Sequence, residues 1–178
     1  MPSYVVLLRA VNVGGRQLKM AQAREVLSDN GFDDVESHIQ TGNFLLRSTR
    51  RSDVAVEDEV ARVLGEHAGF PIVAVARKPP ELTSLVEAVD GIPAPEGGKA
   101  RYVTFLAKAP TASAARDLEA WDVAGERVHV IGKDVLVDYA VSYHEAKLTG
   151  ARIERTLGVP GTARNMTVVR KLAEKWGQ

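Results

Sequence analysis

The chain has 178 residues, of which 45% are hydrophobic, and its 23 lysine and arginine residues balance 23 aspartate and glutamate residues. A formally neutral chain has no overall field that would attract nucleic acid or a membrane surface. There is no cysteine, which excludes disulfide bonds, thiolate catalysis and cysteine-bound metal and is expected of a cytoplasmic protein. No apolar run approaches the roughly 20 residues that span a bilayer, and the N-terminus lacks the pattern of a signal peptide. These features predict a cytoplasmic protein with no membrane partner.

The hydrophobic pattern of residues 1–90 predicts a β-α-β-β-α-β order. Residues 4–8 form a continuous apolar run, which is typical of a central strand buried on both faces. Residues 35–40 follow a period of two, and Gly42 is suited to the tight turn that leads into a partner strand. The expected elements are a strand at 4–8, a helix opening at Met20, strands at 35–40 and 43–47, a helix capped by Asp53, and a strand at 72–75.

The second half of the chain shows a similar pattern after a Gly/Pro-rich stretch at residues 91–100, which predicts a linker. We therefore expect an N-terminal half at residues 1–90, ending in a short helix from Pro79-Pro80, and a C-terminal half at residues 101–178. The C-terminal elements expected are a strand at 102–106, a helix capped by Thr111, a hairpin around Gly132-Lys133, a helix opened by a Ser142–Glu145 capping box and running to Leu157, and a last helix. The final strand of the pattern is predicted to be absent.

Together these patterns predict an α+β protein of two ferredoxin-like (α/β-plait) halves. Each half would have an antiparallel or mixed sheet with helices packed on one face, and a C-terminal helix would follow.

The first candidate site is the Asn12-Val13-Gly14-Gly15 loop between the first strand and the first helix. Consecutive glycines allow backbone N–H groups to converge on an anion, and the following helix N-terminus adds partial positive charge. Arg9, Arg16 and Lys19 add full charges nearby. The same residues would also serve an ordinary turn from strand to helix. The segment matches neither the P-loop nor the dinucleotide-binding signature.

Two further segments carry candidate ligand-binding residues. Gln40 and Asn43 flank the hairpin turn with amides that both donate and accept hydrogen bonds, and they would face the cleft of Asn12 if the first strand lies beside this hairpin. Arg164 stands at the expected start of the last helix, where a cation opposes the helix dipole. A bound anion or an acidic neighbour is expected to compensate it. Asn165 would cap that helix or join the site.

Three other patterns point less strongly to chemistry. The four histidines lie in separate elements, so no metal site or other cofactor is expected. Ser142, His144 and Glu145 look like a hydrolytic set, but a capping box explains Ser142 and Glu145, and residues two apart on a helix point in different directions. Residues 101–105 lack the order of glycines and aromatics found in RNA-recognition strands. Nucleic acid is therefore not the expected partner.

Motifs spread over almost the whole chain carry a family resemblance: Leu8–Gly15, Lys19-Met20, Gln40–Asn43, Lys147-Leu148, Leu157–Val159, Thr162, Arg164-Asn165 and Lys171-Leu172. With them the chain resembles a widespread bacterial family of uncharacterised proteins, domain of unknown function 1697. Members of that family commonly have Gly-Ile where Ala10-Val11 stand, Ser for Thr41, Trp for Met166 and Ser for Ala146. The resemblance implies an α/β-plait protein without an established activity, and it supplies no catalytic residues.

The sequence therefore favours a protein that binds a small anionic or phosphorylated ligand. The expected ligand-binding residues are Arg9, Asn12, Gly14, Gly15, Lys19, Gln40, Asn43, Arg164 and Asn165. One alternative is a protein or nucleic-acid interaction module, which would present an exposed basic or apolar stripe. The other is an enzyme acting on a phosphorylated small molecule. Such an enzyme needs a general base, and the motif segments contain no histidine or carboxylate.

Overall fold

The computed structural model describes residues 1–178 and divides into two compact units. The first unit consists of Met1–Leu82 and Lys175–Gln178, and the second of Thr83–Glu174. The divisions fall inside two helices, α3 (Pro79–Asp90) and α6 (Met166–Trp176). Residues 91–99 connect α3 to the next strand without helix or strand structure. A domain linker at residues 91–100 stays a prediction, which limited proteolysis would test.

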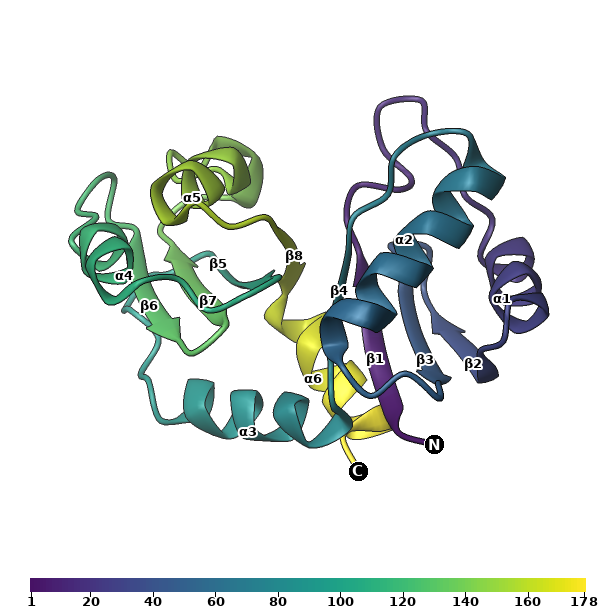
Figure 1. The fold of residues 1–178 in the computed structure, drawn as a ribbon. Helices are drawn as coiled ribbons and strands as arrows, with labels where there is room; N and C mark the ends of the chain where they lie inside the picture. The colour runs from purple at the N-terminus through teal and green to yellow at the C-terminus, as the bar shows by residue number, and fades with distance from the viewer. The chain divides into compact units, whose positions relative to one another are not determined.

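The first unit is built on a four-stranded antiparallel sheet with the strand order β2-β3-β1-β4, shown in Figure 1. Its elements are β1 (Ser3–Leu8), α1 (Met20–Asp29), β2 (Asp33–His38), β3 (Asn43–Arg47), α2 (Asp53–Ala68) and β4 (Ala74–Arg77). The two helices cover one face of the sheet. β1 lies between β3 and β4, and its residues 4–8 are fully buried, as the apolar run predicts. The predicted β-α-β-β-α-β order is confirmed.

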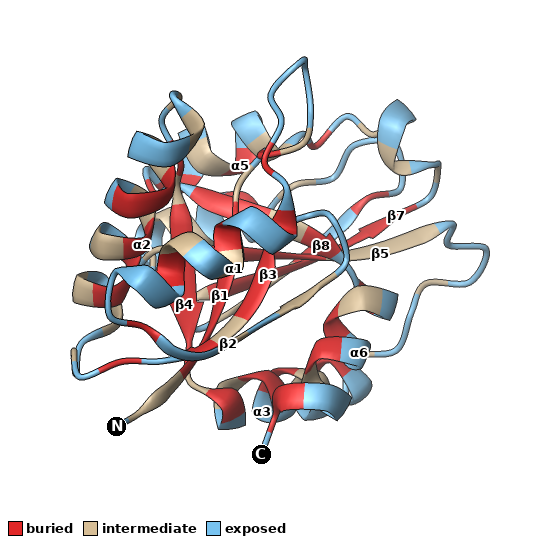
Figure 2. Cartoon of the chain, turned by 90° about the vertical axis from the view of Figure 1, so that its right-hand side faces the viewer, coloured by how far each residue is buried: buried red, intermediate tan, exposed pale blue.

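The core of the first unit lies between this sheet and its helices. Alternate residues of β1, namely Tyr4, Val6 and Leu8, belong to one buried cluster, because successive strand residues point to opposite faces. Helix α1 adds Ala23 and Leu27, which are one helical turn apart. Figure 2 shows buried residues along β1, β3 and β4, with exposed residues on the outer sides of the helices.

The start of α2 differs slightly from the prediction. The Ser52 side chain accepts a hydrogen bond from the Ala55 N–H at 3.0 Å and is the N-cap. Asp53 is instead the first helical residue, where its charge complements the helix dipole. Both residue types are good caps, so the sequence does not discriminate between neighbouring positions.

The second unit repeats this arrangement with the strand order β6-β7-β5-β8. Its elements are β5 (Ala100–Leu106), α4 (Ala112–Glu119), β6 (Arg127–Ile131), β7 (Asp134–Tyr139), α5 (Gly150–Leu157) and β8 (Gly161–Asn165). All three strand pairs are antiparallel. Leu106, Val137 and Ile153 join the strands and α5 in one buried cluster. The predicted class, two ferredoxin-like halves with a C-terminal helix, is confirmed.

Two predictions for the second unit are wrong. The final strand is present as β8, which pairs with β5 from Tyr102↔Asn165 to Leu106↔Gly161. It is short and contains Arg164 and Asn165, so its sequence lacks the apolar run of a buried strand. The Ser142–Glu145 capping box opens only a single 3-10 turn, η1 (Tyr143–Glu145), and α5 begins after Thr149, whose side chain caps it.

Candidate functional site

The loop at residues 9–19 joins β1 to α1 and contains the first candidate motif. It is anchored at both ends by apolar side chains, since Val11 and Leu18 are buried in the core of the first unit. Between these anchors, Gly14 and Gly15 both have left-handed backbone, with φ of +59° and +82°. Their missing side chains make this conformation accessible without strain. This geometry agrees with the expectation that the glycines allow the loop to turn between strand and helix.

Asn12 holds the shape of the loop through its side-chain amide. Its Nδ2 donates to the Leu18 carbonyl at 3.1 Å and to the Gln40 carbonyl at 2.6 Å. Its Oδ1 accepts from the Leu18 N–H at 2.8 Å. One side chain therefore closes the loop on itself and ties it to the turn between β2 and β3. These contacts make Asn12 a positioning residue for the loop.

A shallow pocket of about 520 Å³ lies where this loop meets the turn. It is lined by Asn12, Gly15, Arg16, Gln17, Leu18, Lys19 and Gln40. Two of the lining side chains are cations, and none is a carboxylate or a histidine. The Arg16 guanidinium lies 5.2 Å from the centre of the Phe70 ring. That cation–π contact orients Arg16 beside the pocket.

The N-cap residue of α1 also lines the pocket. Lys19 is the N-cap residue, its side chain makes no capping hydrogen bond, and the first turn of α1 holds no acidic residue. The first N–H groups of a helix have no partner within the helix. At the start of α1 no N-cap side chain accepts a hydrogen bond from these N–H groups. No acidic side chain in the first turn neutralises the partial positive charge of the helix end.

The structure brings together four of the residues expected in the first half: Asn12, Gly15, Lys19 and Gln40 line the same pocket. Gly14 is exposed in the same loop but is not a lining residue. Arg9 is partly buried, and its backbone N–H donates to the Val73 carbonyl at 2.9 Å. Asn43 does not line the pocket either.

Asn43 is fully buried beneath the turn. Its Nδ2 donates to the His38 carbonyl and to Thr41 Oγ1, both at 2.9 Å, so it closes the turn between β2 and β3. Gly42 has a φ of +81°, and a Cβ there would lie 2.8 Å from Leu8 Cβ. The motif at residues 40–43 is thus explained largely by how this turn packs against the end of β1.

Arg164 and Asn165 belong to the second unit. Arg164 is 6% exposed, and its Nη1 donates to Thr162 Oγ1 at 2.8 Å and to the Ala163 carbonyl at 2.9 Å. Burial lowers the pKa of Arg164 to about 10 because the charged form is desolvated. Asn165 Oδ1 accepts from the Val168 N–H at 2.9 Å and caps α6. The expected conflict of Arg164 with a helix dipole does not arise, since Arg164 lies in β8.

Sequence reasoning missed a second buried arginine at an equivalent position. Arg77 pairs with Val5 in the first sheet, as Arg164 pairs with Val103 in the second. Arg77 is 1% exposed, and its Nη1 donates to the carbonyl of the preceding residue at 2.8 Å. Each arginine follows an alanine in a short edge strand, Ala76-Arg77 in β4 and Ala163-Arg164 in β8, and this shared Ala-Arg pair is the only sequence signal that links the two positions.

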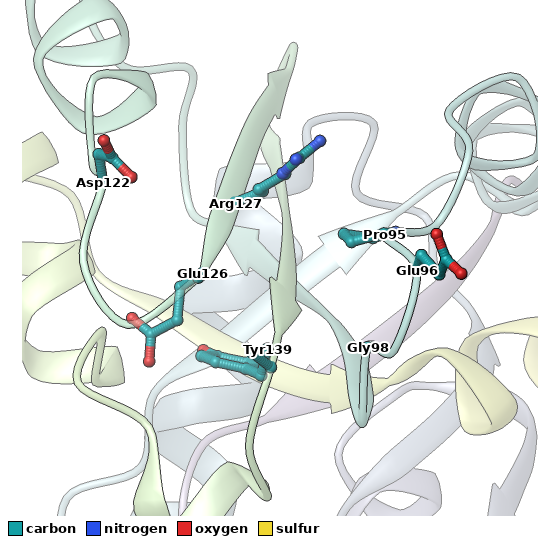
Figure 3. A pocket seen from close by; sticks show the side chains of 9 residues that line it. Pro95, Glu96, Gly98, Asp122, Glu126, Arg127 and Tyr139 are labelled. Carbon is teal, nitrogen blue, oxygen red and sulfur yellow. The ribbon is translucent and has the colours of Figure 1, made fainter.

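A second pocket, of about 310 Å³, lies in the second unit and is shown in Figure 3. Its lining includes Glu96, Asp122, Glu126, Arg127 and Tyr139. The Glu126 carboxylate is 2% exposed and accepts three hydrogen bonds, from the indole of Trp121 and the N–H groups of residues 147 and 148. Those bonds hold the segment that precedes α5, so we assign Glu126 a structural role.

The structure also bears on metal sites and on membrane-spanning helices. No group of three or more histidine, aspartate or glutamate side chains is arranged to hold a metal ion. No helix combines the length and the apolar character needed to cross a membrane.

Comparisons with known proteins give a family and a fold. A family model described as "Protein of unknown function (DUF1697)" matches residues 1–136. No curated protein matches the sequence. Among solved structures, the chain is similar to the conserved bacterial protein SP0830 from Streptococcus pneumoniae, with 19% sequence identity, a TM-score of 0.68 and coverage of 97% of each chain. At that identity the likeness shows a shared fold over the full length of both chains.

Proposed function

Because the chain belongs to the DUF1697 family of proteins of unknown function, we propose from its own geometry that it binds a small anionic or phosphorylated ligand. The observation that carries the proposal is the pocket between residues 9–19 and Gln40, which joins two cations to the uncapped N-terminus of α1. We propose the cytoplasm as its location, on the grounds of the cysteine-free composition.

The electrostatics of the pocket support an anion. Arg16 and Lys19 are both exposed and supply full positive charges, and no lining carboxylate neutralises them. A negative group at a helix N-terminus gains about 0.3–1 kcal/mol from the dipole alone. Charge-assisted hydrogen bonds from a guanidinium or ammonium group are roughly twice as strong as neutral ones. Asn12 contributes by holding the loop in place, since its amide is already engaged.

The same lining supports binding in preference to catalysis. Acid–base chemistry on a phosphorylated substrate needs a group such as histidine or a carboxylate within hydrogen-bond reach, and the pocket has neither. It also has no aromatic side chain on which a nucleic-acid base would stack. A compact anion therefore fits this lining best.

A thermal-shift panel of inorganic phosphate, sulfate, polyphosphate, sugar phosphates and nucleotides tests the proposal. A ligand at one hundred times its Kd adds about 2.7 kcal/mol of stability, which should raise Tm by roughly 5–10 °C. Lys19→Ala and Arg16→Ala should each reduce the shift severalfold. Lys108→Ala is the matched control, because Lys108 is an exposed cation in the corresponding loop of the second unit. A panel without any shift would overturn the proposal and favour an interaction module.

A further inference from the structure

Two exposed apolar residues are next in the chain to residues that line the proposed anion pocket. Val13 is 56% exposed and Ile39 is 44% exposed, and few other large hydrophobic side chains of the chain are this exposed. They are the chain neighbours of Asn12 and Gln40, which line the pocket and are joined by a 2.6 Å hydrogen bond. The two apolar residues therefore lie on the two segments that meet at the pocket.

Ile39 is also held in an unfavourable backbone conformation. Its φ is +54°, in the left-handed region, which is rare and strained for a β-branched residue. Asparagine tolerates this region much better than isoleucine. The buried core does not explain the isoleucine, since Ile39 is 44% exposed and is not part of the core cluster of the first unit. An exposed, strained isoleucine beside a pocket suggests that its side chain has a partner of its own.

We infer that the ligand of this pocket is a soluble amphiphilic anion: a phosphate-like group that carries a short aliphatic chain. The inference rests on the proposed function, because Arg16 and Lys19 would hold the anionic group. Val13 and Ile39 would then contact the aliphatic part at the rim. The combination of cations within the pocket and apolar side chains beside it selects such a molecule over a polyanion such as polyphosphate, which offers no apolar surface.

Calorimetric titration with inorganic phosphate and with methyl, butyl and hexyl phosphate tests this inference. Each added methylene should tighten Kd about twofold, since a rim contact buries roughly half of the methylene surface, so hexyl phosphate should bind about 30-fold more tightly than methyl phosphate. In Val13→Ser and Ile39→Asn this dependence on chain length should flatten, while Kd for inorganic phosphate stays unchanged. Val123→Ser is the matched control, because Val123 is 43% exposed in a loop of the second unit.

Ile39→Asn offers a second readout that a purely structural role would not produce. Asparagine suits the left-handed backbone, so this variant should have a higher unliganded Tm, by about 2–4 °C, although it loses affinity for hexyl phosphate. A loss of Tm together with a loss of affinity would show that Ile39 supports the turn, and this would overturn the inference.

The remaining outcomes separate the inference from the function on which it rests. Equal binding of all four phosphates would overturn the amphiphilic ligand and leave anion binding in place. Absence of binding to every phosphate would overturn both. Sedimentation with vesicles of phosphatidylcholine and phosphatidic acid, without binding of soluble hexyl phosphate, would show that the rim meets a lipid surface and would also overturn the inference.

Discussion

The two units have the same order of strands and helices, but the loop that joins the first strand to the first helix differs in length and sequence. In the first unit, residues 9–19 lead from β1 to α1; in the second, the shorter segment at residues 107–111 leads from β5 to α4. The longer loop contains the glycine pair, two pocket cations and an uncapped helix. The shorter one ends in Thr111, whose side chain caps α4 by accepting from the Ala114 N–H at 3.1 Å.

Around these loops the backbone hydrogen bonds are equivalent. Leu8 and Leu106 each donate to the turn of the neighbouring hairpin, at 2.8 and 2.9 Å. Arg9 and Ala107 each donate to the carbonyl just before the next edge strand, at 2.9 Å in both units. The short loop, residues 107–111, shows that five residues are enough to connect the first strand to the first helix in this fold. The additional residues of the long loop cost conformational entropy on folding, and the proposed ligand binding would give a reason for their presence.

The largest effect should come from the turn against which the long loop rests. Gly42→Ala adds a Cβ 2.8 Å from Leu8 Cβ at a residue with φ of +81°. Strain and overpacking together should lower the free energy of unfolding by about 3 kcal/mol. Urea denaturation followed by the fluorescence of Trp176, which belongs to the first unit, measures this change.

The equivalent turn of the second unit supplies the control for that variant. Gly132 also has positive φ, +61°, but a Cβ there would meet nothing within 4 Å. Gly132→Ala should therefore lose only about 1 kcal/mol, the cost of the backbone conformation alone. Equal losses in the two variants would show that contact with Leu8 is unimportant, and the two turns would then be the same in energetic terms.

The next largest effect concerns the amide that closes the long loop. Asn12→Ala removes three hydrogen bonds and leaves backbone groups of Leu18 and Gln40 without this partner. We expect a loss of about 2 kcal/mol and a weaker phosphate-dependent Tm shift, because the pocket loses its shape. Asn30→Ala is the control, since the Asn30 side chain makes one exposed hydrogen bond, to the Val26 carbonyl. An unchanged Tm in Asn12→Ala would contradict the positioning role.

The strength of the local sequence pattern explains which elements of the fold could be predicted. β1 and α1 have strong local patterns, an apolar run and a helical face, so the sequence predicts their existence. β8 has no such pattern, because two of its five residues are Arg164 and Asn165. It forms because β5 offers an open edge with which it pairs from residue 102 to residue 106. Such pairing depends on tertiary context, which outweighs local propensity.

The grouping of the candidate site residues could be predicted only in part. Lys19 and Gln40 are distant in sequence, but adjacency of β1 and the β2–β3 hairpin brings their segments together, as the predicted topology requires. The burial of Asn43 was not predictable from composition, since an amide beside a glycine is equally suited to a turn or to a ligand. In the structure Asn43 lies opposite Leu7 in the sheet, where it is part of the turn and does not line the pocket.

A substitution that makes the first loop resemble the second tests the comparison directly. Lys19→Thr places at α1 the cap that Thr111 provides at α4, and should raise stability by about 1 kcal/mol. The same change should remove the phosphate-dependent Tm shift, since it deletes a cation and occupies a helix N–H. Thr111→Lys, the reverse change, should lose about 1 kcal/mol and gain no phosphate response. A full phosphate shift in Lys19→Thr would place the anion elsewhere.

The smallest effect should appear at Ala10, where the resembling family commonly has glycine. Ala10 is exposed and has a φ of +50°, which costs alanine about 1–2 kcal/mol. Glycine would remove this strain but would add about 0.5–1 kcal/mol of unfolded-state entropy. Ala10→Gly should therefore gain about 0.5 kcal/mol, measured as a small rise in the urea midpoint.

Lys108 stands at the corresponding position in the second unit and serves as the control for Ala10. It is not among the residues with positive φ, so Lys108→Gly has no strain to relieve and should lose about 0.5 kcal/mol through entropy alone. Opposite signs for the two glycine substitutions would show that the long loop stores backbone strain that the short loop lacks. Stored strain of this kind persists where the surrounding contacts enforce it, and Asn12 and the buried Val11 are the contacts that enforce it here. Equal signs would mean that the long loop is no more strained than the short one, and that its length alone distinguishes it.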